Sequence, residues 1–136
     1  MTTAVSVPAD IIDGLAAMTS ADLDRLPFGA IQLASDGTIL QFNEYEANLS
    51  NRRAPETIGR NFFFDVAPCT RVREFYGRFL DGQKSGELRE TFDYRFAFAQ
   101  APREVSVTLF YSASTMTTWV FVQERPSNER ARPVED

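Results

Sequence analysis

The chain has 136 residues, of which 43% are hydrophobic and 24% are charged, and this size and balance suit one globular domain with a single core. Its net charge of −5 argues against nucleic acid or an anionic membrane surface as the main partner, because both attract basic proteins. No apolar run approaches the roughly 20 residues of a membrane-spanning helix, and residues 1–10 lack the pattern of a secretory signal. We therefore expect neither membrane insertion nor nucleic-acid binding.

The residue inventory excludes the commonest active sites. The chain has no histidine, so a Cys-His pair or a Ser-His-Asp triad cannot form within it. A zinc site is implausible with one cysteine and no histidine, and no glycine-rich phosphate loop or calcium-binding loop occurs. Cys69 is the single cysteine, so no intrachain disulfide can form, which fits the reducing cytoplasm. We expect a cytoplasmic protein that is not an enzyme.

Residues 1–27 are predicted to form a helical cap on the domain. Apolar residues recur at helical spacing over Ile11–Met18, with Asp10 as a possible N-cap. A second short helix is predicted to begin at a cap on Thr19 or Ser20 and to end at Pro27. Helices this short are marginal alone, so we expect the cap to dock on the sheet that comes next.

The segment 28–124 is predicted to form the core of the domain, beginning with a β-hairpin. The stretches Gly29–Ala34 and Thr38–Phe42 have the pattern of strands on either side of an Asp-Gly turn at Asp36-Gly37. Over 43–64 the apolar residues are scattered among polar ones, which predicts short helical turns.

A compact loop over 65–70 precedes a longer helix and three further strands. Pro68 biases the residue before it away from helical geometry, which favours the loop, and a helical apolar face runs from about Arg73 to Lys84. Alternating apolar residues predict strands at Thr91–Phe98, Val105–Tyr111 and Thr118–Gln123. The order indicates an α+β fold, a five-stranded antiparallel sheet with helices on one face, which is the layout of a PAS domain. Residues 125–136 are polar and are predicted to be a disordered tail.

Six segments resemble the photoactive yellow protein family, and together they span about residues 10–124. The most specific of them is the loop Asp-Val-Ala-Pro-Cys-Thr that carries the cysteine. The segments are Leu26–Leu33, Ile39–Asn43, Ile58–Phe63, Asp65–Thr70, Glu74–Gly77 and Trp119–Val122. The resemblance implies a PAS-fold blue-light photoreceptor with p-coumaric acid joined to the cysteine as a thioester. It also implies a light cycle of trans-to-cis isomerisation, proton transfer and loosening of the N-terminal segment, read by a downstream signalling partner.

The same resemblance implies roles for individual residues. Cys69 matches the attachment site, whereas from composition alone a lone cysteine is usually a small buried hydrophobe. Glu46 matches a buried acid that donates a hydrogen bond to the phenolate of the chromophore, because burial keeps a carboxyl group protonated. Arg52 matches the arginine that covers the pocket. The remaining residues expected to line the pocket are Ile31, Phe42, Phe62, Val66, Ala67, Pro68, Thr70, Phe96, Phe98 and Gln100.

Three positions depart from the pattern of the family. Phe42 stands where a tyrosine usually donates to the phenolate, Ser50 replaces a threonine, and Gln100 replaces a methionine. Loss of one charge-assisted donor, worth about 1.5–3 kcal/mol, favours the neutral chromophore. Tyr45 or Ser50 could supply the missing donor, so we expect a mixture of anionic and neutral forms unless Tyr45 compensates. The glutamine predicts slow recovery in the dark.

The sequence is also compatible with two other functions. A PAS module that binds a non-covalent ligand or a partner protein would not need Cys69. A thiol redox sensor would use Cys69 but, without a second cysteine in the chain, would have to pair with another molecule. A hydrolase or transferase is disfavoured by the lack of histidine. Neither the partner nor the oligomeric state is indicated by the sequence.

Overall fold

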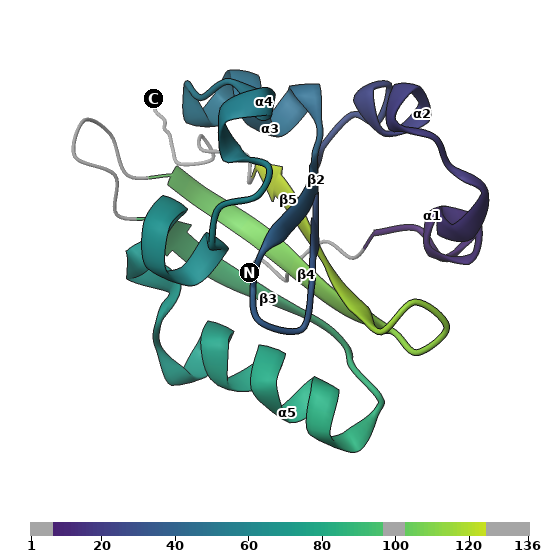
Figure 1. The fold of residues 1–136 in the computed structure, drawn as a ribbon, viewed down its shortest axis with the longest axis vertical. Coiled ribbons are helices and arrows are strands. Elements are labelled where there is room, and N and C mark those ends of the chain that lie inside the picture. Colours follow the sequence, from purple (N-terminus) through teal and green to yellow (C-terminus); the bar gives the residue numbers. More distant parts are fainter. Residues whose placement is uncertain (1–6, 97–102, 125–136) are drawn as a thin grey trace, which may run out of the picture.

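The structure, a computed structural model, describes residues 7–96 and 103–124, and these residues form a five-stranded antiparallel sheet with helices around it (Figure 1). The strands are β1 (Gly29–Leu33), β2 (Ile39–Phe42), β3 (Arg89–Phe96), β4 (Arg103–Ser112) and β5 (Thr117–Glu124). Their order across the sheet is β2-β1-β5-β4-β3, so the last strand pairs with the first. The predicted α+β class and the five-stranded antiparallel sheet are confirmed.

The helical elements are short. They are α1 (Ala9–Asp13), a 3-10 turn (Leu15–Ala17), α2 (Ser20–Asp24), α3 (Glu44–Ser50), α4 (Ala54–Thr57), a π-helical turn (Phe62–Val66), a 3-10 turn (Pro68–Thr70), a second π-helical turn (Arg73–Gly77) and α5 (Arg78–Ser85). The longer helix predicted from the sequence corresponds to the second π-helical turn followed by α5. Its first turn is π-helical because the N–H of Gly77 donates to the Val72 carbonyl, five residues back.

Local sequence signals set several of the element boundaries. Thr19, one of two candidate caps in the sequence with Ser20, caps α2 in a reciprocal pair of hydrogen bonds with Asp22. The turn between β1 and β2 closes at Gly37, whose φ of 93° is readily available to glycine. Asp10 is not a cap. Pro8 precedes α1 instead, and the predicted first helix is interrupted at Gly14, a poor helix former.

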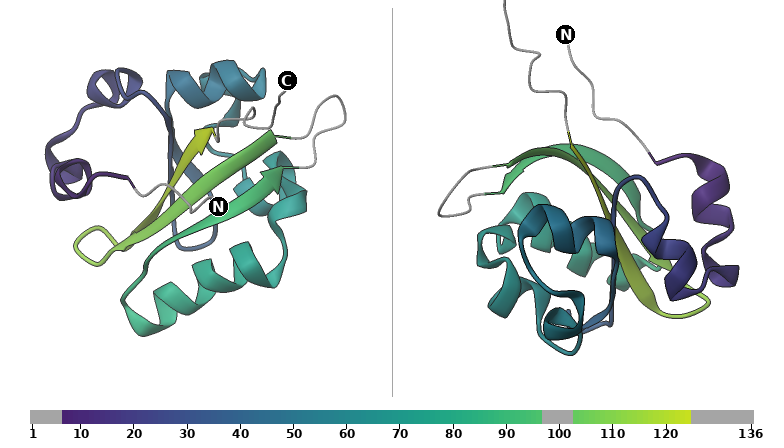
Figure 2. Two further views of the ribbon diagram at one scale, coloured as in Figure 1. Left: turned by 180° about the vertical axis from the view of Figure 1, so that it is seen from behind. Right: turned by 90° about the horizontal axis from the view of Figure 1, so that it is seen from above.

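Helices cover both faces of the sheet, whereas the strand pattern predicted helices on one face only. Figure 2 shows α1 and α2 on the side of the sheet away from α3, α4 and α5. The physical reason is that the central strands are apolar on both sides. Ile31 of β1 and Val120 of β5 face one buried cluster, while Ala30 and Phe121 of the same strands face the other.

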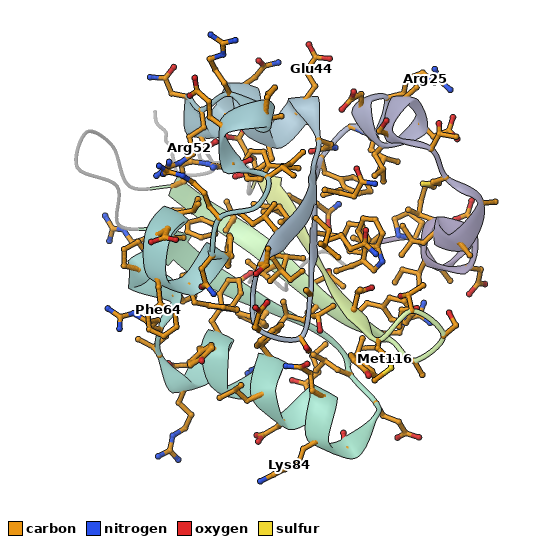
Figure 3. The ribbon with its side chains drawn as sticks, in the orientation of Figure 1. Arg25, Glu44, Arg52, Phe64, Lys84 and Met116 are labelled. Carbon is orange, nitrogen blue, oxygen red and sulfur yellow. The ribbon has the colours of Figure 1, made fainter. Side chains whose placement is uncertain are left out.

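The larger cluster lies between the sheet and the helices that follow β2, and it is rich in phenylalanine. Phe63 and Phe75 are fully buried there with ring centroids 6.0 Å apart in an edge-to-face arrangement. Figure 3 shows that charged side chains such as Lys84 and Glu44 point away from this interior. Within the described residues no helix is long and apolar enough to cross a membrane.

Candidate functional site

Cys69 lies in the 3-10 turn Pro68–Thr70, and its side chain is partly buried against the larger apolar cluster. The turn is closed on Ala67, whose carbonyl oxygen accepts from the Thr70 N–H at 2.9 Å and from the Thr70 Oγ1 hydroxyl at 2.7 Å. Thr70 is completely buried, so this turn is rigidly anchored. The N–H of Cys69 donates to no group in the described part of the chain. Cys69 therefore combines a thiol with a backbone N–H that has no partner among the described residues.

Tyr94 of β3 fixes the same turn from the sheet. Its hydroxyl donates to the carbonyl oxygen of Cys69 at 2.6 Å. The ring packs edge-to-face against Phe75 and Phe96, with centroids 5.3 and 5.5 Å away. Burial raises the pKa of Tyr94, and the neighbouring Cys69 adds to the rise, so the hydroxyl keeps its proton and remains a donor. Sequence reasoning placed Tyr94 on a strand but did not assign it to the site.

Most of the apolar residues predicted to line the pocket lie in the cluster against which Cys69 packs. Each of them is at most 6% exposed. They are Ile31, Phe42, Phe62, Val66, Ala67 and Phe96. Pro68 is exposed on the outer side of the turn. Phe98 and Gln100 lie outside the described residues, so their placement stays a prediction.

Arg52 lies just after α3 and ties it to the segment before the cysteine. Its Nη2 donates to the Val66 carbonyl oxygen at 2.9 Å. It also lines a cavity of about 500 Å³ between α2, α3 and α4, together with Phe42 and Ala47. Neither Cys69 nor Glu46 lines that cavity. The arginine therefore covers one side of the larger cluster.

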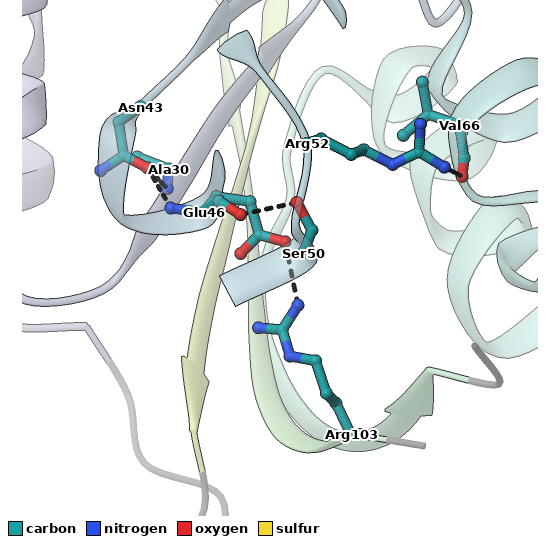
Figure 4. A network of polar contacts seen from close by, with 7 residues as sticks. All are labelled: Ala30, Asn43, Glu46, Ser50, Arg52, Val66 and Arg103. Atoms are coloured by element: carbon teal, nitrogen blue, oxygen red, sulfur yellow. Dashed lines mark hydrogen bonds and ion pairs between the residues drawn. The ribbon is translucent and has the colours of Figure 1, made fainter. Parts of the chain in front are cut away.

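Glu46 of α3 is 4% exposed and lies at the end of the sheet where β1 begins (Figure 4). Its Oε2 accepts from Nη1 of Arg103 at 3.2 Å, and the two side chains are 5% and 11% exposed. Its Oε1 is buried and receives no hydrogen bond from the described residues. The same oxygen lies against Gly29, where an added Cβ would come within 2.3 Å of it. Only a glycine leaves room for the carboxyl group in this position.

The pKa of Glu46 is raised, mainly because burial penalises the charged carboxylate. The Arg103 guanidinium opposes this rise, and Glu124 at the end of β5 adds to it. Burial therefore favours the protonated carboxyl group, which can donate a hydrogen bond. The nearby Arg103 guanidinium favours the ionised carboxylate. Buried carboxyl groups with shifted pKa values are common at functional sites.

Ser50 and Tyr45, the two candidates for a replacement donor, differ in their surroundings. Ser50 Oγ donates to the backbone carbonyl of Glu46 at 2.7 Å, so its proton is used within α3 (Figure 4). Tyr45 is half-buried, and its hydroxyl makes no hydrogen bond within the described residues. It lies roughly 100° around the helix from its neighbour Glu46, whereas Ser50 shares the face of Glu46.

Asn43 joins α3, the helix that carries Glu46, to the N-terminal helical cap. Its Oδ1 caps α3 by accepting from the Glu46 N–H at 3.2 Å, and it also accepts from the Ala30 N–H at 2.9 Å. Its Nδ2 donates to the carbonyl oxygens of Leu23 in α2 and Phe28, at 2.8 and 3.0 Å. The side chain is 2% exposed, so all four bonds are sheltered from water.

Sequence reasoning missed Tyr94, Asn43 and Arg103. Asparagine directly before a helix is a preferred N-cap, so the capping role of Asn43 had a sequence signal. No local signal exists for the bond from Tyr94 to the cysteine turn or for the pairing of Arg103 with Glu46. Both join residues from elements that meet only in the folded chain.

Comparison with known proteins relates this site to a family. The PAS fold family matches residues 17–124. The photoactive yellow protein of Halochromatium salexigens is 42% identical over 114 residues, covering 84% of this chain and 91% of that protein. The chain belongs to the photoactive yellow protein family. The photoactive yellow protein of Cereibacter sphaeroides is 35% identical, covering 82% of this chain and 90% of that protein.

A solved structure agrees with this assignment. The photoactive yellow protein domain of the sensor histidine kinase Ppr from Rhodospirillum centenum is 41% identical. It superposes with a TM-score of 0.78, covering 82% of this chain and 98% of that domain. As a photoactive yellow protein relative with a PAS fold, the chain is a PAS photosensor, and its single cysteine lies in the turn described above.

Proposed function

We propose that the chain is a blue-light photoreceptor that carries p-coumaric acid as a thioester on Cys69. The observation that carries the proposal is a pair of polar groups without partners among the described residues, the N–H of the partly buried Cys69 and the buried Oε1 of Glu46. A hydroxycinnamoyl group has one oxygen at each end, a carbonyl next to the attachment point and a phenol at the far end. Each of the two groups has the chemistry to bind one of these oxygens, and the apolar cluster against which Cys69 packs suits the ring.

Each residue has a defined task in this proposal. When bound, p-coumaric acid supplies a phenol that ionises and a double bond that isomerises on absorbing light. Cys69 holds the acyl group, and its N–H donates to the thioester carbonyl. Tyr94 fixes the peptide of the cysteine through its 2.6 Å hydrogen bond. Glu46 donates its proton from Oε1 to the phenolate oxygen, and Arg52 covers one side of the apolar cluster.

The signal leaves through the helix that carries the acid. Loss of the proton places a carboxylate in a buried site, which costs several kcal/mol unless the charge is compensated. Asn43 connects this helix directly to α2 of the cap through the Leu23 carbonyl. We infer that the ionised acid weakens this connection and that the loosened cap is read by a partner protein. A thiol that must stay reduced to take an acyl group fits a cytoplasmic location.

The test is the intact mass and absorption spectrum of the protein after incubation with activated p-coumaric acid. We expect a mass increase of one p-coumaroyl group and a visible or near-ultraviolet band that bleaches under illumination. The Cys69→Ala variant is the control and should gain neither. An unmodified mass in the native chain, or equal labelling of the variant, would contradict the proposal and favour a PAS module without a chromophore.

A further inference from the structure

The proposed function leaves Arg103 without a role, although it is the charged group that contacts the buried acid. It is the first residue of β4, and it lies opposite Phe96 of β3 in the strand ladder. Its guanidinium carbon lies 5.7 Å from the centroid of the Phe96 ring. The ring face attracts a cation at this distance, so the aromatic residue holds the guanidinium beside the apolar cluster.

The two oxygens of Glu46 have different environments. Oε2 accepts from Arg103 at 3.2 Å, whereas Oε1 is the buried oxygen without a partner among the described residues (Figure 4). The arginine therefore uses only Oε2 and leaves the hydrogen-bonding capacity of Oε1 free for the chromophore in the proposed function. Because Arg103 is 11% exposed and Glu46 is 5% exposed, water screens this ion pair very little.

We propose that Arg103 is the counter-ion of the Glu46 carboxylate and prolongs the state in which Glu46 has given up its proton. This inference rests on the proposed function. In the transfer, the Oε1–H bond of Glu46 breaks, the proton joins the phenolate oxygen of the chromophore, and the negative charge passes to the carboxylate. The guanidinium keeps its own protons and compensates that charge through Oε2. On return, the proton comes back to Glu46 and the charge returns to the phenolate.

The counter-ion changes the energetics of signalling. An uncompensated buried carboxylate is strongly destabilising, whereas a paired and hydrogen-bonded one is much less so. The field of Glu124 also acts on Glu46 and opposes its ionisation. Arg103 therefore decides how readily the acid stays ionised. It is a positioning and electrostatic residue, which acts on the pigment only through Glu46.

The first test uses the protein without chromophore, so that it does not depend on pigment attachment. Infrared spectroscopy follows the carbonyl stretch of protonated Glu46 against pH, with the band assigned by its loss in Glu46→Gln. In Arg103→Gln we expect Glu46 to stay protonated to a higher pH than in the native chain. Arg103→Lys keeps the charge and should restore most of the native titration. Arg95→Gln is the matched control, because Arg95 lies on the same hairpin, is 65% exposed and pairs with Glu104.

The second test measures the return of the protonated Glu46 band after a light flash in the reconstituted protein. We expect the return to be about tenfold faster in Arg103→Gln, since an adjacent opposite charge stabilises a carboxylate by at least that factor. If Arg103→Gln fails to fold, the double variant Glu46→Gln/Arg103→Gln, which removes both charges, shows by its folding that an uncompensated Glu46 carboxylate was the cause.

The inference would be overturned if Glu46 titrated identically in Arg103→Gln and Arg95→Gln. It would also be overturned if Arg103→Gln failed to fold and the double variant Glu46→Gln/Arg103→Gln failed to fold as well. Failure of pigment attachment would instead contradict the proposed function, while the titration without chromophore would still report on the ion pair.

Discussion

At the scale of single residues, the site depends on one acid whose two oxygens have different neighbours. Burial favours the protonated form of Glu46, and the adjacent guanidinium favours the ionised form. Gly29 makes the arrangement possible, because any side chain at that position would collide with Oε1. The two influences on the pKa of Glu46 oppose each other, and burial has the larger effect, so the pKa is raised.

Replacing Glu46 with glutamine should change how stability depends on pH. The folded-state pKa of Glu46 lies above its ordinary value of 4.5, so the folded chain binds this proton more tightly than the unfolded chain. The stability that this proton contributes is full below pH 4.5 and is lost as the pH rises through the folded-state pKa. Urea unfolding of the protein without chromophore should therefore show native stability falling over that window relative to Glu46→Gln. Parallel curves for the two proteins would contradict the raised pKa.

Tyr94→Phe should loosen the cysteine turn. The variant removes the hydrogen bond to the Cys69 carbonyl, and a bond of this kind contributes about 0.5–1.5 kcal/mol. Chemical unfolding measures the loss, and Tyr45→Phe is the control because the Tyr45 hydroxyl has no hydrogen-bond partner among the described residues. We expect Tyr94→Phe to be less stable than that control, and equal stability would show that the bond contributes nothing.

The colour of the reconstituted protein should reveal how many donors reach the phenolate. Phe42 offers no hydroxyl, and the Ser50 proton is used by the Glu46 carbonyl. Glu46 then remains the main donor, so we predict a mixture of visible-absorbing and near-ultraviolet-absorbing forms. Acid titration of the spectrum should increase the near-ultraviolet band. A single visible band that persists unchanged at mildly acid pH would mean that Tyr45 has taken the role of the missing tyrosine.

At the scale of secondary-structure elements, α3 is the part that links the acid to the cap. It is seven residues long and would be marginal as an isolated helix. Asn43 stabilises it at its N-terminus and at the same time bonds to Leu23 of α2. A change in charge on the helix therefore acts directly on a residue that also holds the cap.

Asn43→Ala should be strongly destabilising and should release the cap. It removes the helix cap and leaves the buried Ala30 N–H unpaired, which together should cost about 2–4 kcal/mol in free energy of unfolding. Asn43→Ser retains a capping oxygen for α3 but is too short to keep the bonds to Leu23 of α2 and to Phe28. We expect hydrogen exchange over 9–24 to increase in both variants, and α3 to be weakened only in the alanine variant.

Asn48→Ala is the control for this pair, because Asn48 lies on the exposed side of the same helix. Native-like exchange of the cap in Asn43→Ser would show that the bonds from Asn43 to Leu23 and Phe28 do not hold the cap in place.

At the scale of the whole molecule, the sheet separates the proposed pigment site from the cap. The larger cluster and the cysteine turn lie on one face, and the cap packs on the other against Trp119 and Phe121. The cap has a small cluster of its own, so it can loosen while the larger cluster stays packed. In the proposed function, this two-sided arrangement lets the cap loosen without loss of the core of the fold.

Illumination should increase hydrogen exchange in the cap more than elsewhere in the chain. The expected region is residues 9–28, since these depend on the smaller cluster and on the bonds to Asn43. The measurement compares dark and continuously lit samples of reconstituted protein, with Cys69→Ala as a control that cannot respond. Equal exchange of the cap in both samples would rule out this route for the signal.

The sequence by itself determined the local features of this protein. Alternating residues marked the strands, Asp36-Gly37 marked the hairpin turn, and Thr19 marked the start of α2, because each of these depends on nearby residues only. The segment around Cys69, together with the five other segments, indicated the family. The apolar residues around the site were also predictable, since they form the core in any case.

Only the tertiary structure decided how the two ends of the site are held. Arg103 and Glu46 are 57 positions apart, and they meet because strand register places the arginine opposite Phe96, beside the helix. Tyr94 and Cys69 are 25 positions apart, and they meet because β3 packs beside the cysteine turn in the folded chain. The placement of the cap on the far face followed from both sides of the central strands being apolar, combined with the order of the strands. Residue patterns describe which side of an element is apolar, whereas these contacts depend on how the elements pack together.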